Sequence, residues 1–204
     1  DHLGGLFSVV ETLRVNRVYT PPPEGSQGEL VEQFVKFCAK KRIPVSSVAY
    51  PGKIPFSGGT LRVCHPDPET GRRIAKDNDW SLVLLVRWHD RATALLTGDI
   101  EAAGERHLLN KPVRATLLKA PHHGSDTSCS LPFLQAVAPA AIVVSTARES
   151  RLPALGSQAR QRLESLGSPI WRTDLDGGLI FRPEPHGFGV MSSRHQTGSA
   201  LRQP

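Results

Sequence analysis

The chain has 204 residues, of which 39% are hydrophobic and 22% charged, a balance typical of a folded protein and not of a disordered one. Its formal net charge of +6 at pH 7 suits an anionic partner but does not identify one. Apolar runs such as 82–86 and 140–144 are far shorter than the roughly 20 residues of a membrane-spanning helix, so we predict no transmembrane segment. The sequence shows no signal peptide and begins at Asp1, and we expect it to be a fragment.

Three cysteines, Cys38, Cys64 and Cys129, are spaced without any CxxC pair. An odd number at this spacing argues against a disulfide framework and against a zinc knuckle. We therefore expect core or incidental thiols.

Hydrophobic periodicity predicts helices and strands that alternate along the chain. In chain order we expect a helix over 6–13, a strand over 15–20, a helix over 30–38, strands over 45–49, 60–64, 80–88 and 92–97, a helix over 100–109, a strand over 115–119, a helix over 131–137, a strand over 141–145, a helix over 157–166, and strands over 169–173 and 178–182. The short connection 89–91 predicts a hairpin, and 174–177 predicts a turn. The fold class is therefore α/β, with a layered sheet.

Residues 1–182 contain no internal repeat of fixed period and no evident linker, so we predict a single domain there. The segment 183–204 is rich in Gly, Ser, His and Pro and has no periodicity. Such a composition cannot bury much apolar surface, which predicts a disordered tail.

Polar residues with metal-binding chemistry follow two of the predicted strands. Asp99 ends the apolar run 95–99, where α/β sheets present site residues, although an Asp before a helix is by itself more typical of an N-cap. His122 and His123 follow the strand 115–119, and a turn allows both imidazoles to approach one site. Asp1 and His2 precede the first helix as a further pair of ligand-type residues.

Taken in this order, residues 1–5 (DHLGG), 97–101 (TGDIE) and 121–125 (PHHGS) resemble the metallo-β-lactamase superfamily. Within it, they are similar to the C-terminal hydrolase domain of the DNA-uptake channel proteins of the ComEC family. Residues 78–84 (NDWSLVL) and 172–174 (RTD) support the resemblance, which covers residues 1–182.

The resemblance implies an αββα sandwich with a metal site at one edge of its sheets, here lacking its first strands. Asp1 and His2 match the last two positions of the HxHxDH motif, Asp99 matches the bridging carboxylate, and His122 and His123 match the HHGS loop. The metal set implied is one or two zinc or manganese ions. Asp1 and Asp99 are the implied catalytic residues, with Asp1 orienting the attacking hydroxide.

Two departures from the family pattern weaken this site. The histidines that precede Asp1 in the motif are absent, and Ala154 stands where the family has its last metal-binding His. Metal affinity falls as ligands are lost, so we expect weak or no metal binding and no activity from this chain alone. Four further histidines, His65, His107, His186 and His195, are more typical of structural or surface residues.

The function implied is a metal-dependent DNA phosphodiesterase of a competence protein, active in DNA uptake during natural transformation. Its partners are DNA and an upstream membrane channel region of the same protein, with no small-molecule cofactor. The resemblance places the whole protein in the bacterial inner membrane with this domain on the outer face.

Two alternatives stay open from the sequence. A disabled domain could serve as a DNA-binding or structural appendage, and a hydrolase of a small ester or lactam would use the same metal machinery. DNA contact would involve basic side chains, although these are more typical of a solvated surface: Arg72, Arg73, Lys76, Lys111, Arg114 and Lys119.

Overall fold

The computed structural model describes residues 3–22, 28–71, 78–88, 91–147, 155–184, 187–194 and 199–202. Several residues named above lie outside this part of the chain: Asp1, His2, Arg72, Arg73, Lys76, residues 89–90, Ala154, His186 and His195. No helix within the described ranges has the length and apolar character needed to cross a membrane.

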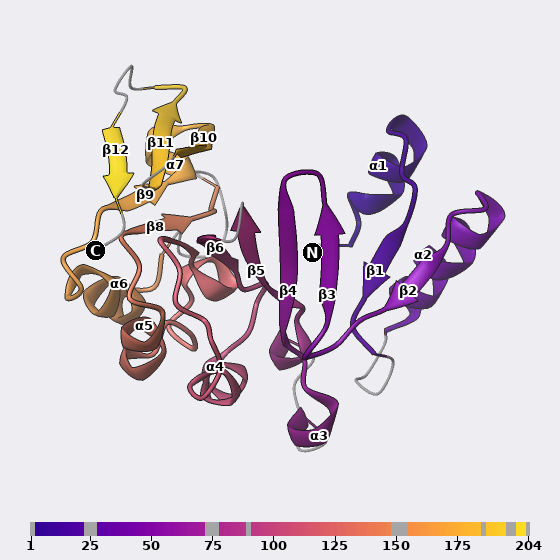
Figure 1. Cartoon of the computed structure of the whole chain (residues 1–204), viewed down its shortest axis with the longest axis horizontal. Helices are drawn as coiled ribbons and strands as arrows, with labels where there is room; N and C mark the ends of the chain where they lie inside the picture. Colours follow the sequence, from indigo (N-terminus) through magenta and orange to yellow (C-terminus); the bar gives the residue numbers. More distant parts are fainter. Residues whose placement is uncertain are drawn as a thin grey trace.

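A mixed seven-stranded sheet forms the centre of the fold (Figure 1). Its strands, in spatial order, are β3 (Lys53–Phe56), β4 (Gly59–His65), β5 (Val83–Trp88), β6 (Arg91–Leu96), β7 (Leu117–Lys119), β8 (Ala141–Val144) and β9 (Ile170–Arg172). Neighbours are antiparallel from β3 to β6 and parallel from β6 to β9. The central strands are rich in Val, Leu and Ile because both of their faces are covered. The predicted α/β class and the hairpin of β5 with β6 are confirmed.

Helices α4 (Ala102–Leu108), α5 (Leu131–Val137) and α6 (Ser157–Glu164) lie along one face of this sheet (Figure 1). Their apolar side chains and those of the strands form the main core, whose largest fully buried members are Leu85, Leu95, Ile100, Leu108, Leu118, Phe133, Leu134, Ile142 and Leu163. Cys64 and Cys129 belong to this core, and all three cysteines are free and buried. The predicted core thiols are thus confirmed.

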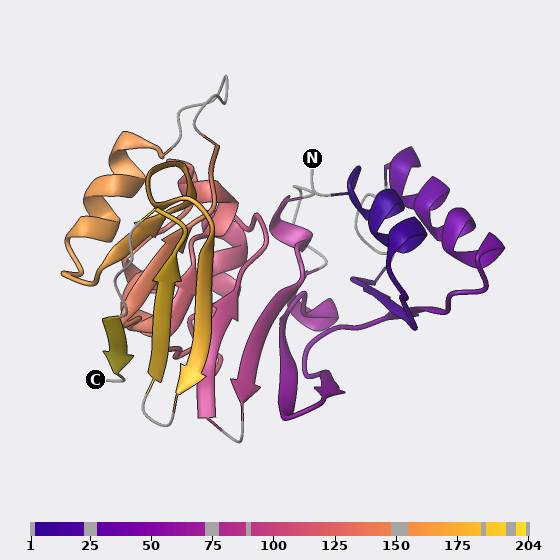
Figure 2. The ribbon, with the colours of Figure 1, turned by 90° about the horizontal axis from the view of Figure 1, so that it is seen from above.

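A second, three-stranded antiparallel sheet covers the other face: β10 (Leu179–Glu184), β11 (Gly187–Ser192) and β12 (Ser199–Arg202). Figure 2 shows β10 and β11 lying across the larger sheet. Phe188 and Val190 alternate along β11 and are buried against Ala94, Leu117 and Ala141. The described residues after Pro183 thus form strands in a segment for which the sequence predicts a disordered tail.

The N-terminal residues form a smaller unit. Helix α1 (Leu6–Thr12) and helix α2 (Glu29–Lys40) pack against each other beside the parallel strands β1 (Val18–Thr20) and β2 (Val45–Ser47). Phe7 and Phe34 meet edge to face with ring centroids 5.1 Å apart, in a cluster with Val10 and Cys38. Figures 1 and 2 place this unit beyond β3, at the opposite end of the molecule from α6.

Short elements account for the remaining differences from the prediction. Strand β3, which pairs with β4, was not predicted. Residues 78–80 form a 3₁₀ turn (Asn78–Trp80) and not the start of a strand. Residues 174–177 are not a simple turn, because Thr173–Asp176 form the short helix α7 and lead the chain from the larger sheet at β9 to the smaller one at β10. Helix α3 (Pro68–Gly71) follows β4.

Candidate functional site

The candidate site lies at one edge of the larger sheet, where the parallel strands β6, β7 and β8 end. In the parallel register, Leu95 pairs with Leu118, and Lys119 pairs with Val143. The segments that follow these strands, 97–101, 120–125 and 145–147, therefore meet at this edge. Two of them carry the site residues expected from the sequence.

Asp99 follows β6 in a tight turn. Gly98 has φ +57°, and a Cβ there would lie 2.8 Å from the Cβ of Ser81, so this turn requires glycine. The backbone N–H of Asp99 donates to Ser81 Oγ at 3.1 Å. The alternative reading of Asp99 as an N-cap is wrong, because helix α4 begins at Ala102 with Glu101 in the capping position. The Asp99 carboxylate is instead directed toward the residues after β7.

Asp79 also holds the turn that carries Asp99. It was not predicted as part of the site. Its carboxylate oxygen Oδ1 accepts hydrogen bonds from the backbone N–H groups of Glu101 at 2.7 Å and Gly104 at 2.8 Å. Its backbone carbonyl accepts a hydrogen bond from His65 Nε2 at 2.7 Å. Because Asp79 and His65 are both buried, they act as a rigid support for the turn that carries Asp99 and Glu101.

His122 and His123 lie in a 3₁₀ turn (Pro121–Gly124), both with left-handed backbone, at φ 46° and 55°. This conformation is unfavourable for residues other than glycine and persists only where the surroundings impose it. The turn is linked to the Asp99 turn, because the His122 N–H donates to the Gly98 carbonyl at 3.2 Å.

Two charged side chains hold the chain that follows the histidine turn. The buried carboxylate of Glu105 accepts from the N–H groups of Cys129 at 2.5 Å and Ser130 at 2.9 Å. Arg162 donates to the backbone carbonyls of Ser128 at 2.8 Å and Cys129 at 2.9 Å. Burial raises the pKa of Glu105, while these hydrogen bonds and Arg162 oppose the shift. Residues of helices α4 and α6 thus hold residues 128–130, which follow the histidine turn.

The hydrogen bond of His123 fixes which of its ring nitrogens faces the site. Nδ1 lies 2.7 Å from the Ser145 carbonyl, which can only accept, so Nδ1 carries the proton. In the neutral ring, Nε2 then carries the lone pair, and it lies 3.6 Å from Asp99 Oδ2. Two electron-pair donors that face each other at this distance suit a shared cation better than a direct hydrogen bond.

His122 is oriented by a different carboxylate. Its Nδ1 lies 3.4 Å from Glu101 Oε1 and 3.5 Å from Thr127 Oγ1. Glu101 Oε1 also accepts a hydrogen bond from Asn78 Nδ2 at 3.4 Å. An Nδ1–H directed at a carboxylate leaves Nε2 as the nitrogen available for a ligand, the arrangement common around metal-bound histidines. Glu101 is therefore a site residue that sequence reasoning missed, although it lies within the TGDIE segment.

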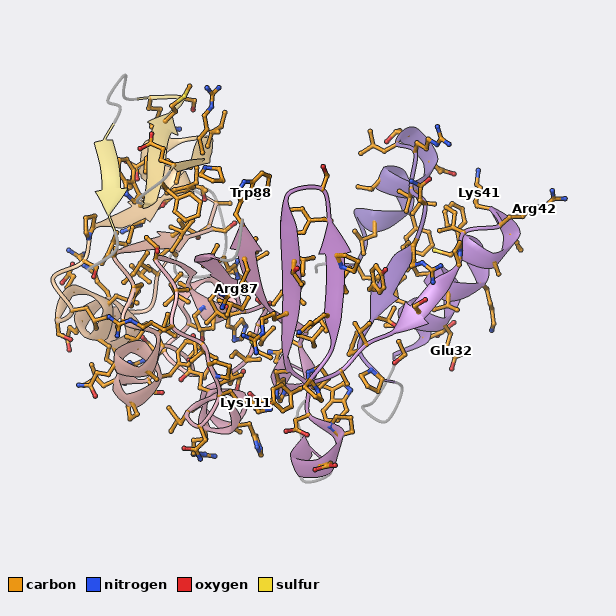
Figure 3. The ribbon with its side chains drawn as sticks, viewed as in Figure 1. Glu32, Lys41, Arg42, Arg87, Trp88 and Lys111 are labelled. Carbon is orange, nitrogen blue, oxygen red and sulfur yellow. The ribbon has the colours of Figure 1, made fainter. Side chains whose placement is uncertain are left out.

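A partly buried lysine completes the surroundings of Asp99. Lys119 Nζ lies 3.7 Å from Asp99 Oδ1 and 3.3 Å from the Gly98 carbonyl oxygen. Burial lowers the pKa of Lys119, while Asp99 opposes that shift. Lys119 is thus not part of a solvated surface, and neither is Lys111 (Figure 3), which pairs with Asp67 at 2.9 Å and lies 3.9 Å from the Tyr50 ring centroid.

Residues 172–174, which support the family resemblance, have a structural role here. Thr173 Oγ1 accepts from the Thr146 N–H at 2.8 Å and donates to the Thr146 carbonyl at 2.6 Å. Arg172 and Asp174 form an ion pair at 2.6 Å. These contacts hold the end of β8 against the end of β9 and so position the Ser145 carbonyl that orients His123.

The donor chemistry at Asp99 and His123 fits a divalent metal ion, but the set is incomplete within the described residues. No group of three His, Cys, Asp or Glu side chains that could hold an ion converges among them. Asp1 and His2, the further ligands expected from the sequence, lie outside the described ranges. His65 is buried and stacks on His107 with centroids 6.1 Å apart, in agreement with the structural role predicted for both.

No family model matches the chain. It is 30% identical over 184 residues to Competence protein ComA of Neisseria gonorrhoeae and 31% identical over 187 residues to ComE operon protein 3 of Bacillus subtilis. Each alignment covers 89% of this chain and 23% of the relative. It is also 37% identical over 107 residues to Uncharacterized protein YcaI of Escherichia coli, covering 50% of this chain and 14% of that protein.

These similarities show that this mixed α/β chain is homologous to one section of the competence proteins. The chain spans less than a quarter of the length of the curated relatives named here.

Proposed function

We propose that this chain is the metal-dependent hydrolase section of a competence protein, acting on DNA phosphodiesters during DNA uptake. The observation that carries the proposal is the approach of His123 Nε2 to Asp99 Oδ2 at 3.6 Å, from the ends of neighbouring parallel strands. The Ser145 carbonyl fixes the proton of His123 on the other nitrogen, so Nε2 presents its lone pair toward the Asp99 carboxylate, and both are ligand types that bind a divalent cation.

Asp99 and His123 would hold a zinc or manganese ion together with Asp1 and His2, the ligands expected from the sequence. His122 would join them through Nε2, with Glu101 keeping its proton on Nδ1. When bound, such an ion supplies an activated water and stabilises charge on the attacked phosphate. Lys119 adds a fixed positive charge beside Asp99, which suits an anionic substrate.

The layers of the fold agree with a metallo-β-lactamase-type sandwich lacking its first strands. Helices α4–α6, the seven-stranded sheet and the smaller sheet of β10–β12 form successive layers (Figure 1). The candidate site lies at one sheet edge, as that architecture requires.

DNA is the proposed substrate because the relatives include proteins named for competence and, at 26% identity, Recombination protein 2 of Haemophilus influenzae. A basic chain of net charge +6 suits that polyanion. In the whole protein, this section adjoins a membrane channel region on the outer face of the bacterial inner membrane.

A nuclease assay on the protein that carries this chain tests the proposal. Labelled single-stranded and duplex DNA is incubated with manganese or zinc, with and without a chelator. We expect metal-dependent cleavage that is lost in Asp99→Ala and His123→Ala and retained in Lys36→Ala, which alters an exposed side chain on α2. Cleavage by Asp99→Ala at the wild-type rate contradicts the assignment.

The same experiment also distinguishes a hydrolase from a disabled domain. DNA binding without metal uptake and without cleavage would favour a DNA-binding appendage over a hydrolase.

A further inference from the structure

One face of β3–β5 carries a group of cations that lies outside the candidate site. Lys53 on β3 is directly opposite Arg62 on β4, and Arg62 is opposite Leu85 on β5. Arg87 lies two residues beyond Leu85 and is opposite Thr60. Residues directly opposite each other, and residues two apart along a strand, share a face of the sheet. Lys53, Arg62 and Arg87 therefore lie together; we name them the basic strand surface.

The charge of this surface is not balanced within its own strands. Strands β3, β4 and β5 contain no Asp or Glu. Neither Lys53 nor Arg62 forms an ion pair with any residue of the described ranges. Like charges directly opposite each other destabilise a sheet, so this pair carries a cost that a bound anion would offset.

The surface is also open to a partner. Lys53 is exposed, and Arg62 and Arg87 are partly exposed. Helix α4 contacts β4, and Leu85 on the same face is buried in the main core, whereas β3 forms the edge of the larger sheet and lies clear of helices α4–α6 (Figures 1 and 2). Arg87 is labelled in Figure 3, on the strand next to β4.

The same strands connect this surface to the candidate site. Strand β4 runs from Arg62 to His65, which pairs with Val83 of β5, and Ser81 just before β5 accepts the N–H of Asp99. Three residues of a strand span about 10 Å. A polyanion lying on the basic strand surface would therefore reach the edge of the sheet that carries Asp99 within a few nucleotides.

We propose that Lys53, Arg62 and Arg87 bind the phosphate backbone of DNA and guide it to the candidate site, an inference that rests on the proposed function. A nucleic-acid backbone suits this surface better than a lipid headgroup layer. Surface binding to a membrane combines cations with inserted apolar side chains, and none of the exposed large hydrophobic residues in the described ranges lies on β3, β4 or β5.

The test measures DNA binding by fluorescence anisotropy over a range of salt concentrations, with a chelator present so that cleavage and metal binding play no part. Each phosphate contact adds about 0.9 to the slope of log affinity against log salt for duplex DNA, and about 0.7 for single strands. The variant Lys53→Ala with Arg62→Ala should therefore reduce the slope by about 1.8 on duplex DNA.

A matched control removes the same charge elsewhere. Lys36→Ala with Lys40→Ala changes two exposed cations of α2, outside strands β3–β5, and should leave the slope unchanged. Circular dichroism of both variants verifies that the fold is retained, since the four side chains lie outside the core.

Four results overturn the inference. An unchanged slope in the Lys53/Arg62 variant excludes the surface, and an equal loss in the control variant shows that net charge alone is responsible. Loss of binding to vesicles of anionic phospholipid, with DNA binding intact, assigns the surface to a membrane instead. Failure of the wild-type chain to bind DNA overturns the proposed function as well. DNA binding by the wild type with a reduced slope in the Lys53/Arg62 variant, but without cleavage, supports the basic strand surface and contradicts only the hydrolase.

Discussion

The imidazole Nε2 of His123 faces the Asp99 carboxylate at 3.6 Å, although the two residues come from separate turns after strands β6 and β7. Other residues hold each side chain in this position. The Asp99 turn is held by Asp79 and Ser81, and the His123 ring is held by the Ser145 carbonyl. The pair is therefore pre-organised by residues that do not contact a ligand.

Asp79 is the residue whose loss should disturb this arrangement most. Asp79→Ala leaves the buried N–H groups of Glu101 and Gly104 without their acceptor. Hydrogen bonds to a buried charge contribute strongly, so we expect the free energy of unfolding to fall by about 3 kcal/mol in urea denaturation. Glu69→Ala, which alters an exposed acid on α3, is the control and should change stability by less than about 0.5 kcal/mol. A small effect at Asp79 would show that the turn is stable without it.

The titration of His65 should lower the free energy of unfolding in mildly acidic solution. Burial lowers the pKa of His65 from 6.5 to about 4, with Lys111 and His107 acting in the same direction. Below pH 6.5 the unfolded chain therefore binds a proton that the folded chain does not. The stabilisation is present above pH 6.5 and is lost as the pH falls toward 4, by about 3 kcal/mol in total.

Urea unfolding at a series of pH values measures this effect. His65→Phe removes the titrating ring, so the difference in unfolding free energy between wild type and variant should shrink as the pH falls through this window. Parallel pH profiles for the two proteins would show that another group is responsible.

Strand β11 offers a direct test of the ordered C-terminal segment. Phe188 is 4% exposed and packs between the two sheets, so Phe188→Ala should lower the free energy of unfolding by about 3–5 kcal/mol. Met191 lies on the same strand and is 45% exposed, so Met191→Ala should have little effect. Equal, negligible effects would mean that β11 does not pack on the larger sheet in solution.

Periodicity alone predicted most of the larger sheet, because strands such as β5, β7 and β8 contain runs of Val, Leu and Ile. Strand β3 escaped prediction because Pro55 interrupts it and the run is only Lys53–Phe56. Strand β11 escaped because it is short and glycine separates its buried residues, Phe188 and Val190.

The site was predictable where chemistry follows a strand end, as at Asp99, His122 and His123. The residues that orient them were not predictable from spacing. Asp79 and Ser145 act through contacts between segments far apart in the sequence. Glu101 was the exception, since it lies two residues after Asp99 in a segment already recognised.

The most direct test of the central claim is the affinity of the protein that carries this chain for manganese and zinc, measured calorimetrically in a double-mutant cycle of Asp99→Ala and His123→Ala. If both side chains bind one ion, each single variant should lose affinity, and the double variant should lose less than the sum, with a coupling of about 1 kcal/mol or more. Additive losses, or no measurable metal binding by the wild-type protein, would contradict a shared cation between these two residues.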